Sequence, residues 1–173
     1  MQYLKNTIDL PRIIGMGVSS NIYIWVDKSY AVHENMRGHT GGVTSMGEGI
    51  ILLRTAKQKL NIKSSTESEI VGASEYLPWC LWLQYFMITQ GYKINKNLFY
   101  QDNESAIKLE KNGKSSSTDH TRHINIRYFF ITDVVKREDI YVEHCHTSRM
   151  LADYFTKPQS NYAPCTFTFQ GAC

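Results

Sequence analysis

The chain has 173 residues, 42% of them hydrophobic, which is enough to bury one sizeable core. Its 19 Lys and Arg residues exceed its 16 Asp and Glu residues so slightly that bulk charge does not indicate a nucleic-acid partner. No apolar run reaches the roughly 20 residues that cross a bilayer, and the four cysteines form no CxxC pair. These features argue against a membrane-spanning or disulfide-stapled protein, and we expect an intracellular, cytoplasmic domain with reduced thiols and no signal peptide.

Three strands are predicted first along the chain. Side chains alternate from Asn21 to Asp27 with the two-residue period of a strand, which leaves a carboxylate at the strand end. Two β-rich runs, "GGVTSM" and "GIILLRT", follow between residues 41 and 55. The glycines at positions 47 and 49 predict a turn that makes these two runs an antiparallel pair.

A long helix is predicted next, from residue 64 or 65 to about Gln90, where Gly91 stops it. Pro78 is expected to kink or interrupt this helix. Beyond it, the pattern predicts a strand at residues 97–100, helices at about 103–112 and within 120–139, a strand at 139–145 and a short helix that Pro158 stops. The order βββαβααβα belongs to the α/β class.

The long helix carries Glu67, Glu69 and Glu75 near its start. A capping box with Ser64 or Ser65 would use Glu67, which also faces the positive end of the helix dipole. At about 100° per residue, Glu75 lies almost opposite the apolar stripe, so we assign it to solvent. The helical wheel does not separate Glu67 from Glu69. The capping argument alone leaves Glu69 as the carboxylate without a structural explanation.

Four acidic residues then occupy comparable places. Asp27 ends the first strand, Glu69 lies near the start of the first helix, Asp102 follows the fourth strand, and Asp153 lies in the last helix. Strand ends and helix starts on one side of a sheet converge, and converging carboxylates repel one another unless cations bind between them. Oxygen ligands suit Mg²⁺ or Mn²⁺, and a pair of such ions can cleave a phosphodiester. Chance placement of acidic residues at element ends is the alternative at this point.

Six segments carry a family resemblance, and they occur in the order "WVDKSYAVH", "RGHTGG", "TAKQKLNIKSSTESEIVGA", "YQDNESAI", "TRHINIRYFFI" and "MLADYFTKP". Together they resemble the ribonuclease H domain of copia-type LTR retrotransposon polyproteins. The resemblance implies an RNase H-like α/β fold, a mixed five-stranded sheet flanked by helices. It also implies Mg²⁺- or Mn²⁺-dependent hydrolysis of the RNA strand of RNA–DNA hybrids during reverse transcription, with metal-binding, catalytic carboxylates at Asp27, Glu69, Asp102 and Asp153.

The resemblance also implies a domain organisation. Residues 1–20 resemble the end of the segment that joins reverse transcriptase to ribonuclease H, so the reverse transcriptase domain of the same polyprotein is an expected partner. Residues 21–158 form the RNase H-like domain, and residues 159–173 are a divergent tail without charged residues. An intact element of this family would carry the domain in a cytoplasmic virus-like particle.

Several further residues are candidates for binding the nucleic acid. Backbone and small polar groups beside the metal site, such as Asn103 and Ser105, are expected near the 2′-hydroxyls of an RNA strand. Basic side chains clustered around one loop and helix start are expected at phosphates, and a solvated basic face is the alternative. They are Lys111, Lys114, Arg122 and Arg127.

His146, or His144, lies before the last helix, where related ribonucleases H place a histidine that helps the product leave. Simple strand alternation also explains the sequence "HCH" at this point. Two other functions remain as alternatives for the whole domain. One is an inactive nucleic-acid-binding or scaffold module from a decayed element, which would need no intact quartet. The other is a transposase or integrase of related fold, which normally places its glutamate on a late helix.

Overall fold

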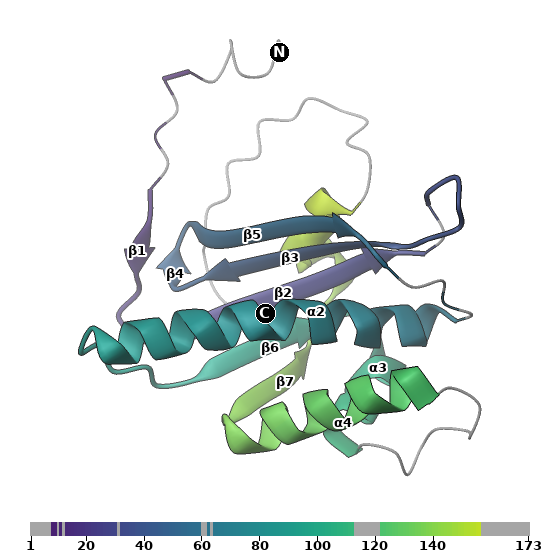
Figure 1. Ribbon diagram of the computed structural model, residues 1–173. Helices are drawn as coiled ribbons and strands as arrows, with labels where there is room; N and C mark the ends of the chain where they lie inside the picture. The colour runs from purple at the N-terminus through teal and green to yellow at the C-terminus, as the bar shows by residue number, and fades with distance from the viewer. Residues whose placement is uncertain are drawn as a thin grey trace.

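The computed structural model describes residues 8–9, 11, 13–30, 32–59, 62, 64–112 and 122–156, with the backbone alone at residues 112 and 122–125. Its centre is a five-stranded sheet (Figure 1). From one edge to the other, the strands are β5 (Ile50–Lys57), β3 (His39–Ser45), β2 (Ile22–Ser29), β6 (Asn97–Gln101) and β7 (Ile140–His144).

The sheet is mixed, as predicted. β2, β3 and β5 form an antiparallel meander, whereas β6 pairs in parallel with β2 and β7 pairs in parallel with β6. Gly47 and Gly49 have positive φ angles and form the predicted turn region between β3 and β5. Within that turn, β4 (Gly47–Glu48) pairs with β1 (Gly15–Met16) in a small second sheet. The predicted domain limits near residues 20 and 158 stay predictions.

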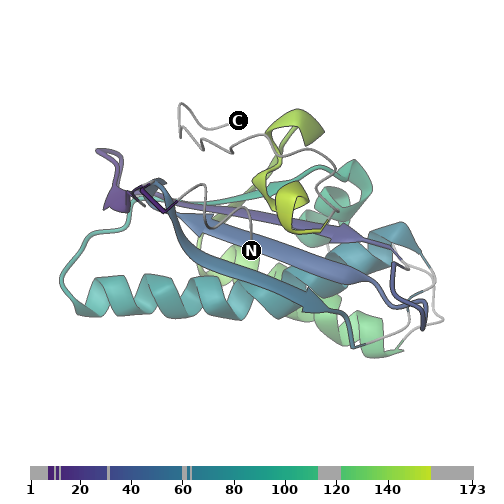
Figure 2. The same ribbon diagram turned by 90° about the horizontal axis from the view of Figure 1, so that it is seen from above.

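Helices cover the sheet on both faces. The long helix α2 (Ser65–Thr89) and α4 (Arg122–Arg137) lie on one face, and two short 3-10 helices, η2 (Thr147–Arg149) and η3 (Leu151–Phe155), lie on the other (Figure 2). The main core fills the space between β2 and α2, and a smaller apolar cluster lies under η3. None of the helices in the described part of the chain is long and apolar enough to span a membrane.

The ends of α2 follow the predicted capping. The side chain of Ser64 accepts a hydrogen bond from the backbone N–H of Glu67 at 3.1 Å, and Gly91 follows the helix with a φ of 88°. Pro78 lies inside α2 but does not interrupt it. Buried Leu77 and Cys80 anchor the helix on both sides of Pro78, and this packing offsets the backbone hydrogen bond that proline cannot donate.

The last helix and the cysteines differ from expectation. Residues 151–155 form a 3-10 helix, not an α-helix, and Pro158 lies outside the described residues. Cys80 is a free, buried thiol, as predicted, and burial raises its pKa to about 12. The prediction of reduced thiols is wrong for Cys145, which is disulfide-bonded. A disulfide requires that two cysteines approach each other in the folded chain, and their spacing along the sequence does not show this.

Two adjacent glycines of β3 determine how closely its neighbours approach. The side of β3 at Gly41 faces Thr156 and η3, and the side at Gly42 faces the ring of Tyr76 on α2. Both glycines belong to the predicted β-rich run "GGVTSM", and both lie inside the strand. Gly42 leaves room for the buried Tyr76, whose hydroxyl is 2.9 Å from Thr44 Oγ1. Glycine here serves close packing and not a turn.

Gly42→Ala is expected to destabilise the protein by about 3 kcal/mol, because its Cβ would overlap the Tyr76 ring in a filled core. Urea unfolding monitored by circular dichroism measures the loss. Gly17→Ala is the matched control, since its Cβ would approach no atom closer than 3.4 Å. Equal unfolding midpoints for the two variants would show that Tyr76 moves aside without cost.

Candidate metal centre

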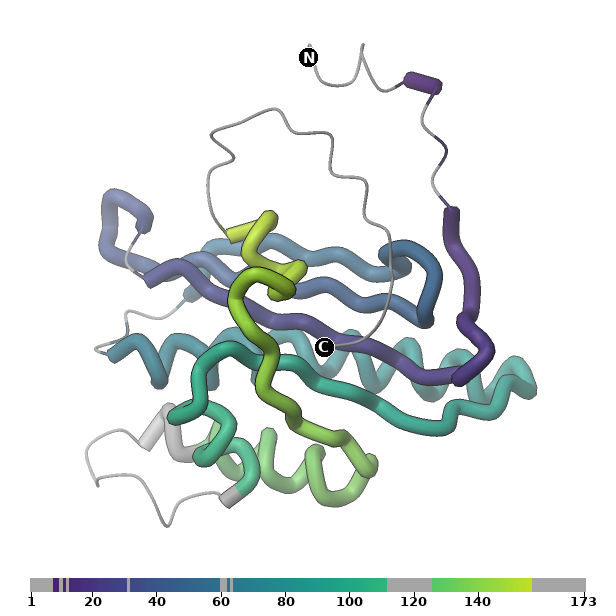
Figure 3. Tube along the Cα trace, turned by 180° about the vertical axis from the view of Figure 1, so that it is seen from behind, coloured from purple at the N-terminus to yellow at the C-terminus, as the bar shows by residue number. Residues whose placement is uncertain are grey.

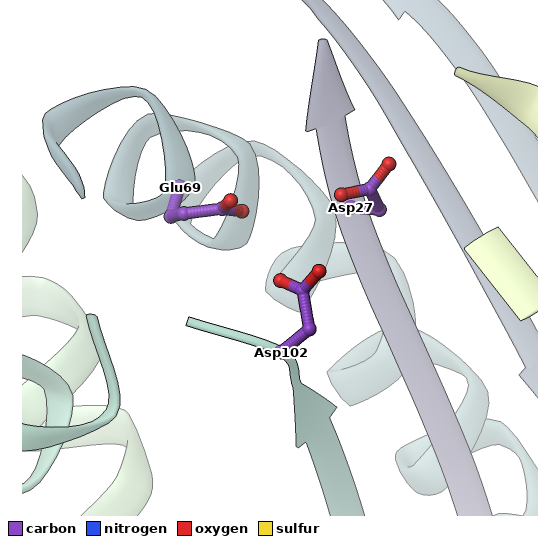
Figure 4. Close-up of side chains that lie close together, drawn as sticks. All are labelled: Asp27, Glu69 and Asp102. Atoms are coloured by element: carbon purple, nitrogen blue, oxygen red, sulfur yellow. The ribbon is translucent and has the colours of Figure 1, made fainter. Parts of the chain in front are cut away.

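Three carboxylates from separate elements converge at one edge of the sheet. Asp27 lies on β2, Glu69 on α2, and Asp102 directly after β6 (Figure 4). One oxygen from each lies within 4.8 Å of the others. Three of the four predicted acidic residues are therefore neighbours in the folded chain.

The sheet topology explains this convergence. The parallel pairing of β2 with β6 ends at Trp25 and Tyr100, so β2 continues through Asp27 paired only with β3, and Asp102 directly follows the end of β6. Glu69 points from the first turns of α2 toward the carboxylates of Asp27 and Asp102 at these strand ends (Figure 4). Ligand sites form at such points in α/β sheets, where neighbouring strands diverge.

The electrostatics of Glu69 suit a cation. Its side chain is almost fully buried, and burial raises its pKa well above the ordinary value. Lys28 opposes this rise, whereas the carboxylates of Asp27, Asp102 and Glu110 add to it. The Oε2 atom of Glu69 is buried and has no hydrogen-bond partner within the described part of the chain. A hard divalent cation would supply the missing partner and relieve the repulsion, so these residues fit Mg²⁺ or Mn²⁺.

Asp153 lies on η3, outside this group of three. Thr156 connects it to the group: the Thr156 backbone N–H donates to the carbonyl of Asp153 at 3.2 Å, and its hydroxyl donates to Asp27 Oδ2. η3 is therefore tied to the acidic cluster through Thr156. The role of Asp153 as a fourth ligand stays a prediction.

Lys28 is not among the site residues predicted from the sequence. This residue follows Asp27 in the chain but belongs to the opposite face of β2, toward α2, where its Nζ lies 3.8 Å from Glu69 Oε1. The sequence does indicate that Lys28 is buried, because strand alternation places it on the same face as Ile22, Ile24 and Val26. A lysine in that position has to find a partner on the covering helix.

Glu110 on α3 (Glu104–Asn112) was missed as well. Its side chain is buried, and its Oε1 accepts a hydrogen bond from Gln101 Nε2 at 3.3 Å. Its Oε2 has no hydrogen-bond partner among the residues that the structure describes. Burial raises the pKa of Glu110 to about 8. Helical spacing alone does not reveal a buried carboxyl on an amphipathic helix, because its burial depends on how α3 packs against α2, α4 and β7.

The other two glutamates of α2 have structural roles. Glu67 supplies the N–H that Ser64 caps, as predicted, although its Oε2 is buried and makes no hydrogen bond back to the helix start. The assignment of Glu75 to solvent is wrong. Its carboxylate lies 3.7 Å from Arg127 Nη2, and its side chain is only 23% exposed, because α4 packs over this part of α2.

Arg127 is one of the predicted phosphate contacts, and the structure shows its packing partners. Its Nη1 donates to Ser74 Oγ at 2.5 Å, beside the ion pair with Glu75, and both contacts join α4 to α2. Lys111 is exposed in the last turn of α3. Lys114 and the side chain of Arg122 lie outside the described residues. The phosphate contacts of all four basic residues stay predictions.

The remaining candidates lie near the carboxylates in the chain. Asn103 Oδ1 accepts hydrogen bonds from the N–H groups of Ser105 and Ala106 at 3.0 and 3.1 Å, so Asn103 caps α3 directly after Asp102. Ser105 is exposed. His146 is exposed too, and its Nδ1 accepts from the Ser148 N–H at the start of η2. His146 follows the end of β7 on the same side of the sheet on which Asp102 follows the end of β6.

A polar pocket of about 240 Å³ lies away from this cluster. It is placed at the start of β6, whereas Asp102 follows the end of that strand. Its lining residues are Gln84, Ile94, Asn95, Lys96, Asn97, Arg137, Glu138 and Asp139. We take the three carboxylates and not this pocket as the candidate site, because they converge, two of them are buried, and Glu69 Oε2 has no hydrogen-bond partner among the described residues.

Comparison with known proteins relates the sequence to transposon polyproteins. The chain is 31% identical over 134 residues, 76% of its length, to the retrovirus-related Pol polyprotein from transposon TNT 1-94 of Nicotiana tabacum. It is 27% identical over 165 residues to the Pol polyprotein from transposon RE1 of Arabidopsis thaliana. The chain covers only 10% and 11% of these two polyproteins. No family model matches it.

Solved structures identify the fold. LC11-RNase H1, isolated from compost by a metagenomic approach, superimposes with a TM-score of 0.59 at 10% identity over 79% of this chain and 92% of that chain. LC11-RNase H1 in complex with an RNA/DNA hybrid gives a TM-score of 0.55 at 14% identity over 78% and 93%. At such identities the likeness establishes the fold, and the predicted RNase H-like architecture is confirmed.

Proposed function

Because the chain is an RNase H-fold segment related to the Pol polyproteins of plant retrotransposons, we propose that it is a ribonuclease H that hydrolyses the RNA strand of RNA–DNA hybrids. The convergence of Asp27, Glu69 and Asp102 within 4.8 Å carries this proposal. The hybrid-bound LC11-RNase H1 of the same fold supports the choice of substrate.

In this proposal, Asp27, Glu69 and Asp102 hold Mg²⁺ or Mn²⁺, and Asp153 completes the ligand set from η3. The bound ions would activate a water molecule and stabilise the leaving oxygen of the phosphodiester. The protein's own part is to fix the ligands. Thr156 holds the Asp27 carboxylate through its hydroxyl, and burial excludes water from Asp27 and Glu69.

The remaining residues contact the substrate and product. Asn103 and Ser105 lie beside Asp102 at the start of α3, where they would meet the RNA strand. Lys111, Lys114, Arg122 and Arg127 contact phosphates, and exposed His146 helps the product leave. The enzyme works during reverse transcription beside the reverse transcriptase domain of its polyprotein, inside the cell, in a cytoplasmic virus-like particle when the element is intact.

Cleavage of a labelled RNA–DNA hybrid tests the proposal. The purified chain is expected to cut the RNA strand with Mg²⁺ and not with EDTA. Asp102→Asn is expected to slow cutting by about three orders of magnitude, since removing one charged ligand costs transition-state stabilisation on the order of 4 kcal/mol. Asp133→Asn on the exposed side of α4 is the matched control and is expected to cut normally.

Two outcomes would contradict the proposal. Cutting by Asp102→Asn at the wild-type rate would place the activity elsewhere. No cutting by a folded wild-type chain would favour an inactive module from a decayed element.

A further inference from the structure

Lys28 is a buried lysine beside the three carboxylates. Its side chain is 5% exposed, and its Nζ lies 3.8 Å from Glu69 Oε1. The same Nζ donates a hydrogen bond to Ser65 Oγ at 2.9 Å. Both partners are on the first turns of α2, which packs on the face of β2 that carries Lys28. The ammonium group is therefore held in place by the helix that supplies Glu69.

The contact with Lys28 places the two carboxylate oxygens of Glu69 in different surroundings. Oε1 is near the ammonium of Lys28, whereas Oε2 is buried and has no hydrogen-bond partner among the described residues. A divalent cation that binds Glu69 would stand close to the ammonium, and two positive charges in a buried site repel each other strongly. Without a metal, the ammonium is instead a favourable neighbour of the acidic cluster, because buried charges require an opposite charge.

We propose that Lys28 is a built-in counter-ion of Glu69 that competes with the divalent cation, so that it stabilises the metal-free fold and lowers the metal affinity of the site. The inference rests on the proposed function, because it takes the acidic cluster to be the metal site. It adds a residue that regulates this site, and it predicts that metal binding displaces the Lys28 ammonium from Glu69.

A Mn²⁺ titration by calorimetry, on the full chain stripped with EDTA, measures the competition. Lys28→Met is expected to bind Mn²⁺ about tenfold more tightly than the wild-type chain, because the competing charge is gone. Lys28→Arg keeps the charge and is expected to bind as the wild type does. Lys93→Met removes the same charge from an exposed loop before β6 and serves as the control.

The outcomes of the titration separate the two proposals. If the wild-type chain binds Mn²⁺ and Lys28→Met binds it with the same affinity, Lys28 does not compete with the metal. This result would overturn the inference and would leave the proposed function standing. No Mn²⁺ binding by any of the folded chains would overturn both.

Unfolding in EDTA tests the pairing without any metal. In urea titrations, Lys28→Met is expected to raise the unfolding equilibrium constant about tenfold, because it leaves the buried Glu69 without its cation. In the Glu69→Gln background the same substitution is expected to have a much smaller effect. Equal effects in both backgrounds would show that Lys28 and Glu69 do not interact, and this would overturn the inference whatever the titration shows.

Discussion

Glu69→Gln is expected to abolish metal-dependent cleavage of the hybrid, whereas Glu67→Gln is expected to leave it nearly intact. The two substitutions are chemically identical and lie two positions apart on α2. Glu69 is buried, and it converges with Asp27 and Asp102. Glu67 lies in the first turn, where Ser64 caps its backbone N–H. Only the first substitution removes a charged oxygen from the proposed metal site.

The loss in Glu69→Gln is expected to reach about three orders of magnitude in cleavage rate, since an amide is a much weaker ligand than a carboxylate for Mg²⁺. Glu67→Gln is expected to lose only a few tenths of a kcal/mol in unfolding free energy through its favourable position at the helix N-terminus. Single-turnover cleavage and circular dichroism of both variants measure these effects. Folded variants with equal losses of activity would refute the distinction between the two glutamates.

The second large effect concerns Glu110 and pH. Burial raises the pKa of this carboxyl from 4.5 to about 8. The folded chain therefore holds a proton that the unfolded chain releases above about pH 4.5, and the unfolding free energy falls as pH rises between these two values. Across that window the loss is on the order of 4 kcal/mol, at about 1.4 kcal/mol for each pH unit.

Glu110→Gln removes this proton equilibrium and keeps the shape of the side chain. We expect the variant to be a few kcal/mol more stable than the wild type at pH 8 and about equal at pH 5. Urea unfolding in EDTA at the two pH values measures the difference. Glu34→Gln in an exposed loop is the control. A wild-type chain and a Glu110→Gln variant with the same pH dependence would show that Glu110 is ionised in the folded protein.

Local pattern predicted much of this molecule. The alternation from Asn21 to Asp27 identified β2 and the carboxylate near its end, because a strand's period is visible in a short stretch of sequence. The capping argument separated Glu69 from Glu67, and burial agrees with that choice. The predicted convergence of Asp102 with Asp27 and Glu69 used a single rule, that parallel strands end at the same edge of a sheet.

Other features depend on contacts between distant segments, which local pattern does not contain. The ion pair of Glu75 needs α4, which begins more than forty residues later, and the strand glycine Gly42 is explained only by the ring of Tyr76. Lys28 and Glu110 are ordinary charged residues until α2 and β7 cover them. The 3-10 geometry of residues 151–155 is likewise not visible in their sequence, which is also compatible with an α-helix.

The topology of the sheet also sets the order in which the site can assemble on the ribosome. The meander of β2, β3 and β5 pairs segments that are close in the chain, so it can form while the chain is still being synthesised. Asp27 and Glu69 are then present, but Asp102 joins them only when β6 adds to β2 on the side away from the meander (Figure 3). A nascent chain therefore lacks the complete acidic cluster until its second half has folded. The fold thus delays completion of the proposed metal site without any separate inhibitor.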